Sequence, residues 1–501
     1  MDKKFTKSFK EKFVIDSGYI FTSIIFVNIF TTINSILIAR VLGPEKLGIF
    51  SVIQYLGGLI IMFSSLNLPV TITTFIAEYR VTDKSKIGKT IGTLSLISIT
   101  SSFILITLII LSSDFISNFY NEPSIGFLIK IYTLTIFFTV FSNLCISILA
   151  GFQEMKSVSK LNVILAITNI PITIMLVYYF SILGAILSLI TNSIVSLLIT
   201  LVLVLNLLST EKVKIDFSFD KELLKKIIQF SLPLFLSGVA YTAFQWFGPT
   251  LLSMEENFKD VGSYKVALAI YNLILFVPNA IQYNLMPTVS NLSSSKPESL
   301  SFFVSNTLKI IMLLVLPVIL AANLVSKELI LILFGNAYTD SISATYILVI
   351  SGFFVSIFSS MGAVLMGIKK TKTLMYIDIA FCLLFNISSY FLVKKLGLMG
   401  LASTYLSTYF ILTLLCTFYI SKYITLQYKL LGLPFIVCII FLTSSFFMSY
   451  LFYGVSYYIV GVLLIIVALL IEWKLIDTTD KETIFRICEK LKYKILSEGS
   501  S

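Results

Sequence analysis

Residues 17–48 read SGYIFTSIIFVNIFTTINSILIARVLGPEKLG, and this stretch decides the fold class. An apolar run without a charged residue extends from Tyr19 to about Ile38. A helix needs about 20 mostly apolar residues to cross a lipid bilayer. The run is therefore predicted to be a membrane span, and the Gly43-Pro44 pair after it predicts a turn.

The composition extends this interpretation to the whole chain. Of the 501 residues, 57% are hydrophobic and only 13% are charged, whereas soluble domains have about 25% charged residues. This balance excludes a soluble enzyme, a disordered protein and a fibrous protein. No cleavable signal peptide is visible before the first apolar run.

Fourteen segments are long and apolar enough to span a membrane. They lie near residues 17–39, 48–74, 90–112, 127–150, 161–181, 183–208, 229–252, 264–288, 303–325, 342–367, 374–393, 397–420, 431–451 and 454–473. No loop between these segments is longer than roughly twenty residues, which is about the length of one span. The expected fold is therefore an all-α polytopic membrane protein with 14 transmembrane helices and no soluble catalytic domain.

The basic residues fix the expected orientation. With fourteen spans, both termini lie on one side, and that side carries 29 of the 37 lysines and arginines, against 8 on the other. Cytoplasmic loops carry the excess of basic residues. We expect a multi-pass protein of the cytoplasmic (inner) membrane with both termini in the cytoplasm. The net charge of +11 then needs no nucleic acid partner.

An internal repeat organises the spans. The segment 47–52 matches 261–266 at an offset of 214, and 118–121 matches 333–336 at 215. At an offset of 216, Gly151 matches Gly367 and Gly184 matches Gly400. An even number of spans per repeat predicts parallel halves, with a site between them near the midplane.

The repeat predicts two six-helix lobes and an appendage of two C-terminal helices. The expected boundaries are 1–210 for spans 1–6, 211–428 for spans 7–12, 429–474 for spans 13–14, and 475–501 for a cytoplasmic tail.

Residues that usually carry enzymatic or metal chemistry are scarce. Histidine is absent, and none of the cysteines (Cys145, Cys382, Cys416, Cys438 and Cys488) forms a CxxC pair. We read the cysteines as reduced packing residues and expect no metal, no cofactor and no enzymatic activity. Gly88-Lys89-Thr90 lacks the first glycine of a P-loop, so no ATP motor is expected.

Two segments carry a family resemblance. The turn ARVLGPEKLG at 39–48, and KELILILFGNAY at 327–338, resemble the polysaccharide-transporter (Wzx-type flippase) branch of the multidrug/oligosaccharidyl-lipid/polysaccharide flippase superfamily. The resemblance covers spans 1–12, and two extra spans fit its fourteen-span members. It implies two lobes around a central cavity, whose cationic residues receive a pyrophosphate.

The resemblance also implies a function. The chain is expected to flip a lipid-(pyro)phosphate-linked oligosaccharide across the membrane by alternating access, for assembly of a cell-surface glycan. Expected partners are this substrate, membrane lipids and glycan-assembly enzymes, and the chain is expected to be a monomer. The residues alone leave the sugar, the lipid carrier and the coupling ion open.

Polar residues in span 8 are candidates for the substrate site. Lys265, Asn272 and Asn279 are spaced by seven, so each lies about 20° round the helix from the last, and Gln282 follows about one turn later. A cation inside a membrane is costly, so this stripe should face a hydrated cavity. The alternatives are snorkelling of Lys265 to the outer interface and hydrogen bonding of the asparagines between helices.

Similar polar faces occur in spans 1, 2 and 7, which line the cavity in the family that the chain resembles. The candidates are Asn28, Thr31, Thr32, Ser35, Gln54, Ser237, Tyr241 and Gln245. Ordinary packing between helices is the alternative for all of them.

Charged residues at the ends of spans are candidates for gates or ion coupling. Arg40 could contact phosphate or Glu45 at an outer gate, or anchor the helix at the interface. Glu78 and Arg80 could form an inner-gate ion pair, or a solvated one. Asp378 lies inside span 11, where a carboxylate could carry a coupling proton or sodium ion; the alternative is a hydrated or Lys372-paired carboxylate.

Two other functions remain open. An ion-coupled exporter of small amphipathic compounds should have a carboxylate deep within spans 1–6, and the sequence shows none there. A membrane-embedded polysaccharide polymerase or ligase should have a large outer loop with basic catalytic residues, and no loop is long enough.

Overall fold

The computed structural model describes the backbone of residues 3–218, 220–295, 297–452 and 454–475. It describes their side chains except those of 3–22, 24, 25, 277, 280–284, 287, 294, 295 and 450. The helices of this part are α1 (Lys3–Ser65), α2 (Leu68–Thr82), α3 (Ser85–Leu111), α4 (Ser113–Phe119), α5 (Pro123–Gly151), α6 (Met155–Thr210), α7 (Lys221–Glu255), α8 (Phe258–Ser295), α9 (Pro297–Leu333), α10 (Ser341–Gly367), α11 (Thr371–Ile420), α12 (Tyr428–Leu451), α13 (Val455–Leu475) and a 3₁₀ turn, η1 (Asn336–Tyr338).

Three of the longest helices are interrupted by one residue with a left-handed backbone. These residues are Gly43 in α1 (φ 72°), Ser181 in α6 (φ 53°) and Gly397 in α11 (φ 53°). Each lies where the sequence predicts the boundary between two spans. Ser181 and Gly397 are 216 positions apart and have almost the same ψ, −129° and −128°. This shared geometry supports the predicted repeat.

Local capping explains where several helices begin. The side chain of Asp220 accepts hydrogen bonds from the backbone N–H groups of Glu222 and Leu223 and so caps α7. Glu122 caps α5 in the same way, and Pro123 follows it at the first helical position. Asn67, with φ 54°, separates α1 from α2. These residues set the ends of the helices that form the candidate sites.

The chain forms two compact units. The first comprises Met1–Leu273, Lys327–Leu348 and Lys370–Leu412, and the second comprises Ile274–Ser326, Val349–Lys369 and Thr413–Ser501. These units differ from the predicted lobes and appendage, whose boundaries stay a prediction.

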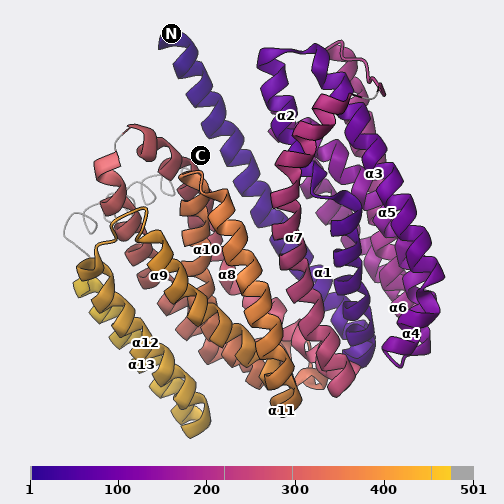
Figure 1. Cartoon of the computed structure of the whole chain (residues 1–501). Coiled ribbons are helices and arrows are strands. Elements are labelled where there is room, and N and C mark those ends of the chain that lie inside the picture. Colours follow the sequence, from indigo (N-terminus) through magenta and orange to yellow (C-terminus); the bar gives the residue numbers. More distant parts are fainter. Residues whose placement is uncertain (1–2, 219, 296, 453, 476–501) are drawn as a thin grey trace, which may run out of the picture. The chain divides into compact units, whose positions relative to one another are not determined.

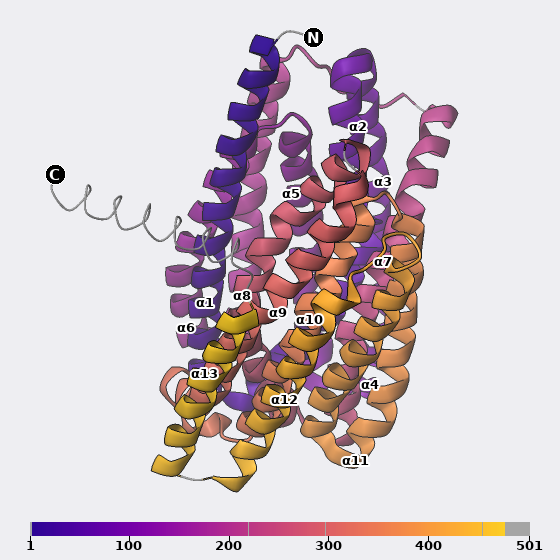
Figure 2. The same cartoon turned by 90° about the vertical axis from the view of Figure 1, so that its left-hand side faces the viewer.

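In the first unit, α6 packs against α1 and α5, and α5 also packs against α2 and α3 (Figure 1). A core of buried apolar side chains joins α2, α3, α5, α6 and the start of α7; it includes Ile72, Ile76, Ile91, Leu149 and Ile227. In the second unit, α12 and α13 lie side by side (Figure 2). Leu324, Met448 and Tyr457 form a buried cluster there.

Ten helices of the described part are long and apolar enough to cross a membrane. Large apolar side chains also cover outward faces: Phe103 is 71% exposed and Leu111 is 77% exposed. Such faces are stable when lipid covers them. The chain is an all-helical, multi-pass membrane protein, as predicted. The count of fourteen spans stays a prediction, since α1, α6 and α11 are each long enough for two.

Candidate functional site

The turn between the two halves of α1 packs directly on the start of α8. A Cβ atom at Gly48 would overlap the carbonyl oxygen of Phe258, and a Cβ atom at Gly262 would overlap that of Pro44. The two pairs are equivalent, because both members are shifted by 214 positions. We call this reciprocal packing the glycine contact. It brings the backbones of α1 and α8 together at one end of the helices.

Within two helical turns of the glycine contact, Lys265 of α8 lies against α1. Its ammonium nitrogen donates a hydrogen bond to the side-chain oxygen of Gln54 at 3.3 Å. The same nitrogen lies 5.0 Å from the ring centre of Tyr55. We call these three residues the Lys265 site. The two predicted residues, 211 positions apart in sequence, therefore meet.

The Lys265 site has unused hydrogen-bonding capacity. An ammonium group has three N–H donors, and no carboxylate in the described part of the chain forms an ion pair with Lys265. The buried hydroxyl of Tyr55 also has no hydrogen-bond partner among the described residues. Such groups are costly to leave unpaired. Together they offer positive charge and a free hydroxyl to an anionic, oxygen-rich ligand.

Sequence reasoning missed the aromatic side chains in this region. Tyr405 of α11 packs near Tyr264 and Tyr271 of α8, at ring-centre distances of 6.4 Å and 6.2 Å. Phe244 of α7 lies 6.2 Å from the same ring. In a span, an isolated tyrosine gives no signal that distinguishes it from a packing residue. The one sequence feature that could have identified two of these tyrosines is their position beside predicted polar residues: Tyr55 follows Gln54, and Tyr264 precedes Lys265.

The remaining polar residues of α8 and α1 stay apart from the Lys265 site. Asn272, Asn279 and Asn28 are exposed in the described structure. The side chain of Gln282 lies outside the described residues. Thr31 and Thr32 donate their hydroxyl protons to backbone carbonyls of α1 itself, and Ser35 is half-buried. Their roles in substrate binding stay a prediction.

The polar face of α7 meets the predicted coupling residue. The hydroxyl of Ser237 donates a hydrogen bond to Asp378 of α11 at 3.0 Å. Asp378 thus has a serine as its partner rather than Lys372, and its side chain is partly buried. Tyr241 and Gln245 follow Ser237 on the same face, and Tyr241 is 55% exposed. A carboxylate placed between two helices can hold a proton or a cation.

Arg40 links the first half of α1 to the end of α9. Its Nε donates to the carbonyl of Leu333 at 2.7 Å, and its Nη2 donates to that of Ile332. Tyr338 adds a hydrogen bond from its buried hydroxyl to the carbonyl of Ala39 at 2.7 Å. Arg40 therefore binds a helix C-terminus, whose carbonyls attract cations, and not Glu45. These bonds reinforce the end where the glycine contact lies.

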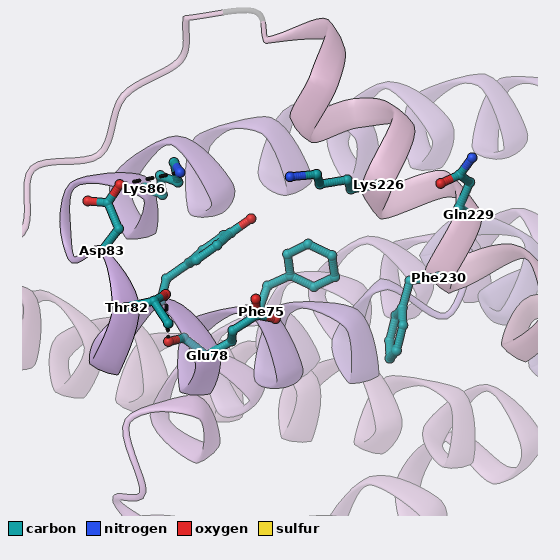
Figure 3. A pocket seen from close by; sticks show the side chains of 9 residues that line it. Phe75, Glu78, Thr82, Asp83, Lys86, Lys226, Gln229 and Phe230 are labelled. Carbon is teal, nitrogen blue, oxygen red and sulfur yellow. Dashed lines mark hydrogen bonds and ion pairs between the residues drawn. The ribbon is translucent and has the colours of Figure 1, made fainter. Parts of the chain in front are cut away.

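Glu78 and Arg80, expected as an ion pair, point to different partners. Arg80 donates to the carbonyl of Phe152 at 2.6 Å and stacks over that ring. Glu78 instead lines a pocket formed by α2, α3 and α7 (Figure 3). The pocket has a volume of about 700 Å³. Its lining residues are Phe75, Glu78, Tyr79, Thr82, Asp83, Lys86, Lys226, Gln229 and Phe230, and we call it the α2–α7 pocket.

The charges of the α2–α7 pocket balance. Asp83 accepts hydrogen bonds from the hydroxyl and the N–H of Ser85 and pairs with Lys86 at 3.3 Å. The Ser85 hydroxyl is the main reason that the pKa of Asp83 lies below its usual range. Lys86 and Lys226 point toward each other from α3 and α7 (Figure 3). Apart from Glu78, sequence reasoning missed this pocket, because its charged residues were counted as solvated loop residues.

The described part of the chain contains no group of three histidine, cysteine, aspartate or glutamate residues that could hold a metal ion. Its cysteines, Cys145, Cys382, Cys416 and Cys438, are free thiols. Cys488 lies outside the described residues.

The sequence of the chain is similar to those of known proteins. A family model described as "Polysaccharide biosynthesis protein" matches residues 13–293. The chain is 23% identical to the "Probable low-salt glycan biosynthesis flippase Agl15" of Haloferax volcanii, over 78% of this chain and 80% of that protein. It is 22% identical to the "Uncharacterized membrane protein MJ1068" of Methanocaldococcus jannaschii, over 84% and 86%.

Solved structures show the fold. The chain resembles the lipid II flippase MurJ in an inward closed conformation, with a TM-score of 0.71, 17% identity, and coverage of 92% of this chain and 98% of that one. It also resembles an inward-facing multidrug resistance MATE family transporter of the MOP superfamily, with a TM-score of 0.64, 19% identity, and coverage of 79% and 95%. The fold is that of the MOP superfamily, as the two sequence segments predicted. The first of these two structures is of a flippase and the second is of a transporter.

Proposed function

The chain belongs to the polysaccharide biosynthesis protein family, and we propose that it is a flippase for a lipid-(pyro)phosphate-linked oligosaccharide. In this proposal it moves the polar headgroup across the cytoplasmic membrane by alternating access, for the assembly of a cell-surface glycan. The relationship to a probable glycan flippase and the MurJ-like fold support it.

Such a substrate poses a specific physical problem. Its lipid tail can stay in the bilayer, but the sugar and phosphate lose their hydrogen bonds to water in hydrocarbon, at a cost of several kcal/mol per polar group. A protein that offers polar groups along a protected route lowers this barrier. The phosphate needs a cation, and the sugar needs hydrogen-bonding side chains.

The Lys265 site is the observation that carries the proposal. Lys265 is a cation inside a predicted span, and no described carboxylate pairs with it. Its remaining N–H donors and the unpartnered Tyr55 hydroxyl match a phosphate oxygen better than an uncharged lipid. The alternative position, extended to the interface, would not place the ammonium between Gln54 and Tyr55. We assign the phosphate of the substrate to this site.

The glycine contact and Arg40 suggest how access alternates. The distribution of basic residues predicts that both termini are cytoplasmic, which places the glycine contact at the outer end of the helices. We propose that the described structure is closed at that end. Outward opening would then separate Gly48 from Phe258 and Gly262 from Pro44, and it would break the hydrogen bonds of Arg40 with Ile332 and Leu333.

The pair of Ser237 and Asp378 supports ion coupling. A carboxylate that accepts one hydrogen bond from serine can also bind a proton or a sodium ion from the cytoplasm. Ion coupling would also drive the second candidate function, export of small amphipathic compounds. The similarity of the fold to that of a MATE family transporter supports this second candidate. The same transport assay separates the two functions.

The test is flipping in proteoliposomes with a fluorescent lipid-pyrophosphate-linked oligosaccharide. Protein-dependent exposure of inner-leaflet label is the expected result. Lys265→Gln should slow flipping about ten- to a hundredfold, the value of one lost charged hydrogen bond. Lys395→Gln is the matched control, since Lys395 is exposed and predicted to lie on the same side of the membrane. Efflux of cationic dyes without flipping of any lipid-linked sugar would favour the exporter instead.

A further inference from the structure

The α2–α7 pocket lies far from the Lys265 site. Gln54 lies in α1 and Phe75 in α2, and at a helical rise of 1.5 Å per residue the stretch of chain between them covers roughly 30 Å along the two successive helices. The charge distribution predicts that the pocket faces the cytoplasm, whereas Lys265 is predicted to lie toward the outer side. The pocket is therefore too far from the Lys265 site to bind the same phosphate.

The lining of the pocket combines aromatic rings with polar side chains that can both donate and accept hydrogen bonds. Phe75 and Tyr79 are buried, with only 7% and 8% exposed, and form an apolar wall. Phe230 of α7 lies 5.8 Å from Phe75, edge to face, and is 38% exposed. Glu78 and Gln229 supply acceptors and an amide donor. The C–H face of a sugar ring packs on such rings, while its hydroxyls bond to such polar groups.

The balance of charge argues against a phosphate in this pocket. The two lysines of the lining, Lys86 and Lys226, are offset by Glu78 and Asp83. A pyrophosphate between the lysines would also approach the two carboxylates, whose repulsion removes most of the attraction. A neutral polyol does not meet this difficulty, because each hydroxyl can donate to a carboxylate and accept from an ammonium.

The size of the pocket suits a short saccharide. Ligand pockets for small molecules have volumes of about 300–1,000 Å³, and this one has about 700 Å³. Lys226 has room for a ligand, since no residue of the described structure forms an ion pair with it. The ammonium group points across the pocket toward Lys86 (Figure 3).

We propose that the α2–α7 pocket binds the sugar portion of the lipid-linked substrate at the cytoplasmic end, before the phosphate reaches the Lys265 site. This inference rests on the proposed flippase function. It divides the headgroup between two sites of different chemistry: a neutral, aromatic-lined pocket takes the glycan, and an unpaired buried cation takes the phosphate.

The test is saturation-transfer NMR on the full chain in nanodiscs, with four neutral, lipid-free disaccharides as probes: lactose, N,N′-diacetylchitobiose, α-1,6-mannobiose and maltose. Saturation is expected to pass to the C–H protons of at least one of them. Phe230→Ala should weaken that binding about tenfold, as expected for the loss of one aromatic contact. Lys226→Gln should weaken it as well.

Two variants serve as matched controls. Lys225→Gln changes the neighbouring exposed lysine, which does not line the pocket. Phe217→Ala removes a phenylalanine that is 57% exposed and also lies outside the lining. Both should bind the saccharide as the wild type does. Inorganic pyrophosphate, which has charge but no C–H face, should not compete with the saccharide.

Three results would overturn the inference: no transfer to any of the four probes, equal binding by all variants, or competition by pyrophosphate. The flipping assay on the same preparation separates this failure from failure of the proposed function. Flipping without saccharide binding removes the pocket from the route and keeps the flippase. Saccharide binding without flipping keeps the pocket and removes the flippase.

Discussion

Gly48 and Gly262 each lie against a backbone carbonyl of the segment that carries the other: Gly48 against Phe258, and Gly262 against Pro44. Such a close approach admits only hydrogen at the α-carbon, because a Cβ atom would overlap the carbonyl oxygen. The contact is reciprocal, and the sequence offset of 214 relates both pairs. Two halves that touch through equivalent positions are what a parallel repeat predicts.

Replacing either glycine should weaken this contact. Gly262→Ala is expected to destabilise the closed arrangement by about 1–3 kcal/mol, the usual cost of overpacking, and to lower the melting temperature in detergent. Gly58→Ala is the control, because a Cβ atom at Gly58 meets nothing within 4 Å and alanine favours the helix. An unchanged melting temperature for Gly262→Ala would show that the two segments are not in contact.

The hydroxyl of Tyr55 should matter for transport and not for stability. Tyr55→Phe removes a hydroxyl without a partner among the described residues, so the melting temperature should stay the same or rise. Flipping should slow, because the phosphate loses a donor.

Tyr120→Phe provides the contrast. The Tyr120 hydroxyl lies 2.9 Å from the hydroxyl of Thr250 and accepts from Trp246 at 3.0 Å. Its removal should cost about 1 kcal/mol of stability. A loss of stability in Tyr55→Phe as large as that in Tyr120→Phe would contradict the assignment of a free hydroxyl.

Asp378 should make transport sensitive to an ion gradient. Wild-type flipping is expected to respond to an imposed proton or sodium gradient, and Asp378→Asn should abolish or strongly weaken the response, because the neutral amide takes up no proton and lacks the negative charge that holds a sodium ion. Asp340→Asn is the control, since Asp340 is exposed and pairs with Lys259 at 2.6 Å. A gradient response that persists in Asp378→Asn would assign the coupling elsewhere.

Ser181 of α6 and Gly397 of α11 interrupt their helices at equivalent positions, and exchanging serine for glycine at one and glycine for serine at the other should shift the melting temperature in opposite directions. Ser181 has φ 53°, where glycine is more stable by about 1 kcal/mol, so Ser181→Gly should raise the melting temperature despite losing the hydrogen bond from Lys46. Gly397→Ser should lower it, because a Cβ atom there lies 2.6 Å from the carboxylate of Glu256. Shifts of the same sign would show that the two turns differ.

Sequence patterns predicted the helices and the turns between them well, and side-chain neighbourhoods less well. The turn at Gly43 and the boundaries near Ser181 and Gly397 follow from Gly-Pro chemistry and from the length that a span needs. Lys265 and Gln54 were both selected as polar residues in apolar spans, because burial of such residues demands a reason. Their mutual contact depends on the packing of α1 on α8, which no local pattern encodes.

The residues that were missed have local patterns typical of other roles. Tyr55 lies in an apolar span and Phe230 near the start of one, where an aromatic side chain indicates packing. Lys226 lies in a basic segment, which indicates a solvated cytoplasmic loop. Glu78 and Arg80 are two positions apart and therefore project to different sides of α2, so their separate partners follow from helix geometry.

The glycine contact has a kinetic consequence. It joins backbone to backbone, so its formation freezes no side-chain rotamers and displaces no long polar chain. The glycine contact then carries little conformational entropy of its own. Closure also fixes the side chain of Arg40, but its rate should depend mainly on the motion of whole helices through lipid. We therefore expect the rate of the proposed transport to vary with membrane viscosity and thickness more than with changes in the apolar side chains near Gly48.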